Sequence, residues 1–187
     1  MSPWIVIILG LAAGLFVIKL AYVTAVALSI KNTRGALYVS TSRLRIRAVL
    51  DELNLTPGQV LMDLGCGDGR ALRAARRQSD ISAIGYEINP LAYLKARIYS
   101  MAAGIDIRYR NFWHEAIDRA DIIFCYLFPD VMAELAAKIQ KEAKPGAVIV
   151  SFNFPIPAFT PVKVLRPAGA RQNDPIYFYR MPDAQGA

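Results

Sequence analysis

The sequence predicts an α/β protein in which a doubly wound, mostly parallel sheet of seven strands follows one N-terminal transmembrane helix. Three observations carry this prediction. After residue 58, short apolar runs alternate with helix-like segments, the pattern of parallel strands joined by right-handed crossovers. The last two strand-like runs follow each other without a helix, which favours a closing antiparallel pair. The first thirty residues form a single apolar run.

That N-terminal run, residues 4–30, carries one charge, Lys19, and no acid. As a helix it would span about 40 Å, enough to cross a hydrocarbon core of ~30 Å. Met1-Ser2-Pro3 lacks the basic start of a secretory signal, although Ala25-Val26-Ala27 resembles a cleavage site, so a signal peptide stays open as an alternative. Basic residues follow the run and none precedes it, which predicts a single-pass membrane protein with a cytoplasmic catalytic domain.

Length and composition limit the class of protein, but the net charge does not identify its binding partner. The chain has 187 residues, a length that fits one domain, and its net charge is +7. A basic domain suits an anionic membrane surface and would suit nucleic acid equally. Two cysteines without C-x-x-C spacing and a single histidine argue against a metal site, and they are typical of free thiols in a reducing compartment.

Breaks in the pattern predict three segments: a transmembrane anchor, a linker with an amphipathic helix, and the domain that holds the sheet, over residues 1–31, 32–58 and 59–182. The linker helix is expected over residues 43–53, where the preceding Ser and Thr residues can cap it. Three alternating arginines in this helix could face lipid headgroups, with an ordinary solvated face as an equal alternative: Arg43, Arg45 and Arg47.

A glycine-rich turn lies at the start of the sheet domain. Residues 60–62 are apolar and predict a buried parallel strand, and residues 71–76 predict the opening of a helix. Between them stands D-L-G-C-G-D-G-R, which begins at Asp63. Glycines allow a tight turn and the close approach of a ligand, and the helix that follows points its free N–H groups at that ligand. The spacing G-x-G-x-G differs from the G-x-G-x-x-G of dinucleotide folds.

The next strand, residues 83–87, ends in an acid. Glu87 follows Gly69 by 18 residues, and a carboxylate there can accept hydrogen bonds from both ribose hydroxyls of a nucleoside. The alternative is a surface turn and a solvated glutamate. The order of strand, glycines, helix, strand and acid favours the nucleoside site.

The remaining elements continue the alternation. Helices are expected over 90–103 and 131–144, with a loose tail from 181, and strands over 105–110, 120–126, 147–152, 161–165 and 176–180. Ligands of such sheets lie beyond the carboxyl ends of the strands, near the point where strand order reverses. Four strand-end segments should therefore converge on one site: residues 63–69, 87, 111–113 and 126–130.

The glycine stretch resembles the first motif of the class I S-adenosylmethionine (SAM) methyltransferases. Together with G-Y-E-I-N-P from Gly85, Trp113 at a strand end and F-P-I-P from Phe154, residues 36–180 resemble one family. It comprises the membrane-anchored lysine methyltransferases of the ATP synthase c-subunit and the adenine nucleotide translocase, with prokaryotic relatives. The resemblance implies a Rossmann-like methyltransferase with SAM as its cofactor, bound by Asp63, Gly65, Cys66, Gly67, Asp68, Gly69, Glu87, Asn111 and Phe112.

One position departs from the family. Members often carry an acid two residues before the tryptophan, to meet the adenine amino group, and this chain has Asn111 there. The amide oxygen of asparagine can accept the same hydrogen bond, so SAM binding is still expected.

The resemblance further implies transfer of a methyl group to a lysine of a membrane protein at the cytoplasmic face of the bilayer. The candidate catalytic residues are Tyr126 and Phe128, whose rings can wall an amine channel, and Asp130, which can orient the ammonium or receive its proton. Core packing is the alternative for the two aromatics. A lipid or quinone methyltransferase and a non-catalytic SAM-binding membrane module stay open as other functions.

Nucleic acid is not expected as a partner. Methylases of exocyclic amino groups carry Asn/Asp-Pro-Pro-aromatic after the fourth strand, whereas this chain has L-F-P-D from Leu127.

Overall fold

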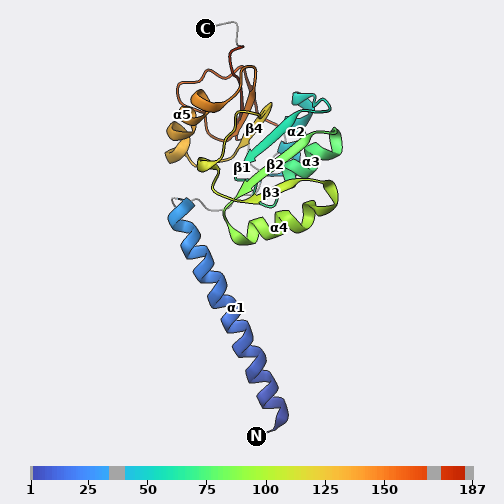
Figure 1. Ribbon diagram of the computed structural model, residues 1–187, viewed down its shortest axis with the longest axis vertical. Coiled ribbons are helices and arrows are strands. Elements are labelled where there is room, and N and C mark those ends of the chain that lie inside the picture. The colour runs from blue at the N-terminus through green and yellow to red at the C-terminus, as the bar shows by residue number, and fades with distance from the viewer. Residues whose placement is uncertain (1, 34–40, 168–173, 184–187) are drawn as a thin grey trace. The chain divides into compact units, whose positions relative to one another are not determined.

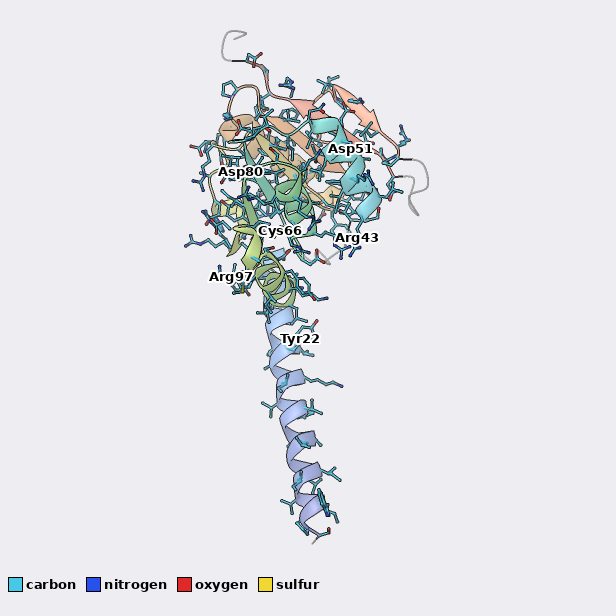
Figure 2. All side chains as sticks on the ribbon, turned by 90° about the vertical axis from the view of Figure 1, so that its right-hand side faces the viewer. Tyr22, Arg43, Asp51, Cys66, Asp80 and Arg97 are labelled. Atoms are coloured by element: carbon cyan, nitrogen blue, oxygen red, sulfur yellow. The ribbon has the colours of Figure 1, made fainter. Side chains whose placement is uncertain are left out.

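The computed structural model describes residues 2–33, 41–167 and 174–183, and the chain divides into two compact units, Met1–Gly35 and Ala36–Ala187. The first unit is one helix, α1 (Pro3–Thr33). Its apolar part, Pro3–Thr24, is long enough to cross a membrane and has no buried residue, and Figure 2 shows side chains projecting from all sides of it. Length and composition thus make it one candidate span, although a signal sequence meets the same criteria.

The second unit is built on a seven-stranded sheet with the order β3-β2-β1-β4-β5-β7-β6. β1 pairs in parallel with both β2 and β4, so strand order reverses at β1, and β7 runs antiparallel to β5 and to β6. These pairings confirm the predicted sheet and its closing antiparallel pair. The strands are β1 (Val60–Leu64), β2 (Ser82–Glu87), β3 (Asp106–Tyr109), β4 (Ile122–Cys125), β5 (Val148–Phe152), β6 (Lys163–Leu165) and β7 (Ile176–Arg180).

Helices cover both faces of this sheet, as Figure 1 shows. One core cluster joins Ile46, Leu72 and Ala96 of three helices to one face, and a second joins Leu135 and Ile139 of a fourth helix to the other. The first three are α2 (Arg43–Leu53), α3 (Arg70–Gln78) and α4 (Pro90–Ser100), and the fourth is α5 (Met132–Glu142). Short 3₁₀ turns are η1 (Met101–Ala103), η2 (Phe112–His114) and η3 (Pro129–Val131).

The first strand has apolar residues on both faces because both are covered. Leu61 belongs to the cluster beneath α2 and α3, and Met62 and Leu64 belong to the cluster beneath α5. Asp63 breaks this pattern, since it is a carboxylate with only 8% of its surface exposed. A buried acid in such a strand points to a specific role at the strand end.

Two expectations for the second unit were wrong. Arg45 does not face solvent or lipid, because it is 1% exposed and shares the inward face of α2 with Val49, one turn later. Arg43 and Arg47 are exposed on that helix (Figure 2 labels Arg43). The chain is also not loose at Met181. This residue is buried, and its N–H donates to the Ala147 carbonyl at 2.8 Å.

Candidate active site

The glycine turn after β1 is held against the end of β2 by its own backbone. The N–H groups of Gly65 and Cys66 both donate to the Tyr86 carbonyl, at 3.0 and 2.9 Å. Gly65, Gly67 and Gly69 have φ angles of 86°, 58° and 73°, in the left-handed region that favours glycine. The alternate spacing of the three glycines therefore follows from the shape of this turn.

A fourth glycine, Gly85 of β2, lets the turn pack closely on the sheet. A Cβ at this position would lie 2.7 Å from the Cys66 sulfur and 2.7 Å from a methyl carbon of Leu72, closer than real side chains approach. Gly85 stands opposite Asp63 in the parallel register. The glycine of G-Y-E-I-N-P is thus explained by packing against the turn.

Glu87 ties the end of β2 to the turn. One carboxylate oxygen accepts the Gly67 N–H at 2.8 Å, and the other accepts the N–H groups of Ile88 and Asn89 at 2.8 and 2.7 Å. Burial raises the pKa of Glu87, and these hydrogen bonds oppose the rise. The oxygen that accepts only the Gly67 N–H keeps a lone pair for one further donor, such as a ribose hydroxyl.

Asp63 has a different environment from Glu87. Within the described residues, no donor forms a hydrogen bond with its carboxylate, which borders the cleft beside Gly65. Burial raises the pKa of Asp63 to about 7, and the charges of Glu87 and Asp68 add to the rise. A buried carboxylate without a donor suits a cationic ligand, which would favour its ionised form.

The cleft at this strand-end edge is lined from several elements: Thr41, Ile46, Asp63, Gly65, Cys66, Gly67, Asp68, Arg70, Ala71, Phe124, Tyr126 and Phe152. Asp68 is paired with Arg70 at 2.7 Å. Burial raises the pKa of Asp68, but the hydrogen bonds and charge of Arg70 outweigh it, so this pKa lies below its usual value. Burial holds the pKa of the Cys66 thiol well above its usual value, which makes Cys66 a neutral lining residue.

A partly buried polar network holds Tyr126 at the cleft. The Asn153 amide donates to the Tyr126 hydroxyl oxygen at 2.9 Å, and its oxygen accepts from an Arg45 nitrogen at 2.5 Å. The Arg45 guanidinium also lies 5.9 Å from the centre of the Tyr126 ring. Asn153 has a φ of 71°, a conformation that asparagine tolerates better than most residues.

Of the predicted acceptor-side residues, the cleft includes Tyr126 but not Phe128 or Asp130. Phe128 is 38% exposed, and Asp130 is exposed in the first turn of η3. The loop after β3 lies at the same sheet edge, where the Asn111 side-chain oxygen accepts the Trp113 N–H at 3.2 Å. Phe112 is half-buried, and its ring lies tilted against that of Trp113, with the ring centres 4.6 Å apart.

Sequence reasoning missed three contributors to this site. Arg45 looked like one of three equivalent arginines, and Asn153 had no motif of its own. Lys138 of α5 is buried and donates to the Glu115 carbonyl at 2.8 Å, which fixes the loop that contains Asn111. The one signal in the sequence was the spacing of Lys138 and Glu142, which lie four residues apart as ion-paired residues of a helix often do. The two side chains form an ion pair at 2.7 Å.

The residues present fit SAM. Asp63 offers a buried negative charge for a cationic ligand, and the glycine turn leaves room beside it, since the nearest atom to a Cβ on Gly65 would be a Leu127 methyl carbon at 3.7 Å. Glu87 offers acceptor oxygens at the adjacent strand end.

Comparison with known proteins agrees with this fit. Residues 63–163 match the family model described as the ANTKMT methyltransferase domain. The mouse adenine nucleotide translocase lysine N-methyltransferase is 34% identical over 132 residues, which are 68% of this chain and 57% of that protein. A protein-lysine N-methyltransferase of Saccharolobus islandicus (strain REY15A) is 30% identical over 147 residues, which are 76% of this chain and 91% of that protein.

A solved structure gives the same fold with a related ligand. The crystal structure of an RNA methyltransferase from Salinibacter ruber in complex with S-adenosylhomocysteine has a TM-score of 0.71 and 28% identity, over 77% of this chain and 94% of that one. S-adenosylhomocysteine is what SAM becomes when it has given up its methyl group. The sequence predictions of a methyltransferase fold, a SAM cofactor and an enzyme are confirmed, and the chain belongs to the ANTKMT methyltransferase domain family of SAM-dependent methyltransferases.

Proposed function

We propose that this methyltransferase methylates the side-chain amine of a lysine in a membrane protein, at the cytoplasmic face of the bilayer. The observation that carries the proposal is that the aromatic side chain of Tyr126 lines the same cleft as Asp63. The same chain carries an apolar N-terminal helix with no buried residue. Two relatives are named as lysine methyltransferases, which supports lysine as the acceptor.

On the cofactor side, Asp63 would pair with the positive charge of SAM, and the turn from Gly65 to Gly69 would receive the ligand against its backbone. Glu87 would accept one ribose hydroxyl at the oxygen that bonds Gly67, while it keeps its bonds to the turn. Asn111 and Phe112 would meet the adenine ring, with Cys66 and Asp68 lining the cleft beside them. When bound, SAM supplies a methyl group on a sulfonium, a good leaving group, so the protein mainly has to align the acceptor.

On the acceptor side, Tyr126 is the residue placed to meet the amine. Its ring can attract the lysine ammonium, and the Asn153 amide already donates to its oxygen, which fixes the orientation of the hydroxyl. Phe128 and Asp130 lie on the exposed loop beyond it and would form the rim where the lysine enters. The neutral amine is the nucleophile, so the rate should rise as pH approaches the ordinary lysine pKa, near 10.4.

On the membrane side, Pro3–Thr24 would span the bilayer, and the basic residues that follow it would keep the catalytic unit in the cytoplasm. A tether of this kind raises the effective concentration of any membrane substrate. It also suits the sequence-based alternatives, a lipid or quinone methyltransferase and a non-catalytic module, so the acceptor has to be identified by experiment.

The test follows the methyl group. The full chain in native membranes is given SAM with a tritiated methyl group, and the membranes are separated into protein, RNA and organic-solvent fractions. Asp63→Asn, which removes the charge in the cleft and weakens SAM binding, serves as the matched control at a limiting SAM concentration. We expect the label in protein, as methyl-lysine after acid hydrolysis. Label in the organic-solvent or RNA fraction, or no transfer above the control, would contradict the proposal.

A further inference from the structure

The outer face of α4 is apolar although it faces solvent. Three residues of α4 and the residue that follows it at the start of η1 make up what we call the α4 stripe: Leu91, Leu94, Ile98 and Met101, with 47%, 51%, 56% and 74% of their surfaces exposed. The described part of the second unit exposes ten large hydrophobic residues, and five of them lie between residues 90 and 103. Such clustering marks an interaction surface, whereas single exposed apolar residues need no explanation.

Helical geometry places these residues on one line. With 3.6 residues per turn, positions 91, 94, 98 and 101 fall within an arc of about 80°. The opposite side of α4 carries its small buried residues, Ala92, Ala96 and Ser100, which pack toward the sheet. The helix therefore has a tight inner face made of small residues and a bulky outer face that nothing in the second unit covers among its described residues.

The charges around the stripe are of one sign. Lys95 and Arg97 are exposed, and each lies about 80° from the middle of the stripe, one on either side (Figure 2 labels Arg97). The sequence from Pro90 to Ala103 contains no acid. An apolar face bordered on both sides by basic residues is the pattern of a helix that lies in a membrane interface, where long cationic side chains reach the headgroups.

We infer that the α4 stripe docks on an anionic lipid bilayer, an inference that rests on the membrane part of the proposed function. Lys95 and Arg97 are positively charged and would attract anionic headgroups, which favours an anionic bilayer as the partner of the stripe. The chain also limits the distance, because only nine residues separate Thr33 from Arg43, and nine extended residues reach at most about 30 Å. Any bilayer crossed by α1 is therefore within reach of the second unit.

Docking would also control where the cleft lies. α4 begins at Pro90, three residues after Glu87, and the Asn89 side chain caps it by accepting the N–H groups of Leu91 and Ala92. The first residue of the stripe is thus joined by a short, capped turn to the strand end that borders the cleft. A bilayer held against the stripe would keep the mouth of the cleft beside the headgroups, where a lysine of a membrane protein emerges.

The test measures docking without relying on methyl transfer. The full chain carrying Leu94→Cys is labelled with the fluorophore NBD and placed in nanodiscs of phosphatidylcholine and phosphatidylserine that contain doxyl-labelled lipid. Both native cysteines are buried, so the label should go to position 94. Gln140→Cys, exposed on α5 at the other face of the sheet, is the matched control.

We expect NBD at position 94 to be quenched by doxyl lipid at least threefold more than NBD at position 140, with the difference reduced in pure phosphatidylcholine. Equal quenching at the two positions would overturn the inference. A blue-shifted signal at position 94 without lipid quenching would show that protein, such as a second copy, covers the stripe, and would overturn it as well.

A second pair of variants links docking to activity. Ile98→Glu should leave SAM affinity unchanged and slow methyl transfer to membranes roughly threefold to tenfold, since α1 still tethers the chain. Ala137→Glu on α5, which is also exposed, should leave both unchanged. If the acceptor is not a lysine, the quenching result still stands, so failure of the proposed function and failure of docking can be told apart.

Discussion

Asp63 and Glu87 lie at the ends of neighbouring strands, and each has only 8% of its surface exposed. Glu87 accepts three backbone N–H groups, whereas no donor of the described residues reaches the carboxylate of Asp63. Equal burial therefore conceals different roles. Glu87 is part of the structure that holds the glycine turn, and Asp63 is a carboxyl group that a cationic ligand would ionise.

The two acids should also differ in their effect on stability. Burial, with the charges of Glu87 and Asp68, raises the pKa of Asp63 from 3.8 to about 7, so the fold favours its neutral form. The stability that Asp63 provides is therefore present below about pH 4 and is lost as pH rises through 7. A bound cation reverses this preference, so SAM should stabilise the protein most above pH 7.

The largest effect is expected from Glu87→Ala. The substitution removes the acceptor of the buried Gly67 N–H, at about 1–3 kcal/mol, and weakens the hold on two half-buried N–H groups, so the free energy of unfolding should fall by about 2–4 kcal/mol. Urea unfolding measures this loss, with exposed Asp118→Ala as the control. A variant as stable as the parent would show that the turn does not depend on Glu87.

Asp63→Asn should give the opposite combination of effects. Loss of the charge should weaken SAM binding by about 1.5–3 kcal/mol, or roughly 10- to 100-fold, while the free protein becomes more stable at pH 8. In the parent, SAM should bind more tightly as pH rises from 6 to 8 and should release protons, which calorimetry in buffers of different ionisation enthalpy detects. Unchanged affinity in the variant would break the contrast between the two acids.

Gly85→Ala tests the packing between the two strand ends. The added methyl group would meet the Cys66 sulfur and Leu72 at 2.7 Å, so we expect a loss of about 1–3 kcal/mol in the free energy of unfolding. Gly104→Ala is a useful comparison, because an added Cβ there would meet no neighbouring atom. Its only cost should be the strain of alanine at a φ of 63°, about 1 kcal/mol. Equal losses at the two positions would argue against close packing at Gly85.

The smallest effect concerns the acceptor side. Tyr126→Phe should lower kcat about tenfold and leave SAM affinity unchanged, because it removes the hydroxyl held by Asn153 and keeps the ring. Asp130→Asn should have a smaller effect, since Asp130 is exposed outside the cleft lining. A larger effect of Asp130→Asn on kcat would place proton handling at Asp130.

The contrast between Asp63 and Glu87 could be predicted only in part from the sequence. Alternating apolar runs and helix-like segments located the strands, and the order of motifs placed both acids at one edge. The sequence could not show which acid is held by the backbone, because that depends on the path of the turn. The burial of Arg45 was also hidden, since alternating arginines do not reveal which one faces the sheet.

The α4 stripe was missed for a related reason. The sequence predicted the helix, but Leu91 and Ala92 are both apolar, and only the structure shows that the small residues face inward and the large ones outward. The three segments predicted from the sequence stay predictions, and the variants above test the individual site residues.

The central claim, methylation of a lysine in a membrane protein, is tested most directly by mass spectrometry of membrane proteins from cells with and without this chain. We predict that at least one lysine loses the mass of one or more CH2 units, the increment that each methylation adds, when the chain is absent, and regains less of it with Asp63→Asn than with the parent. Unchanged protein lysines beside an altered phospholipid or quinone profile would contradict the claim and favour a lipid acceptor.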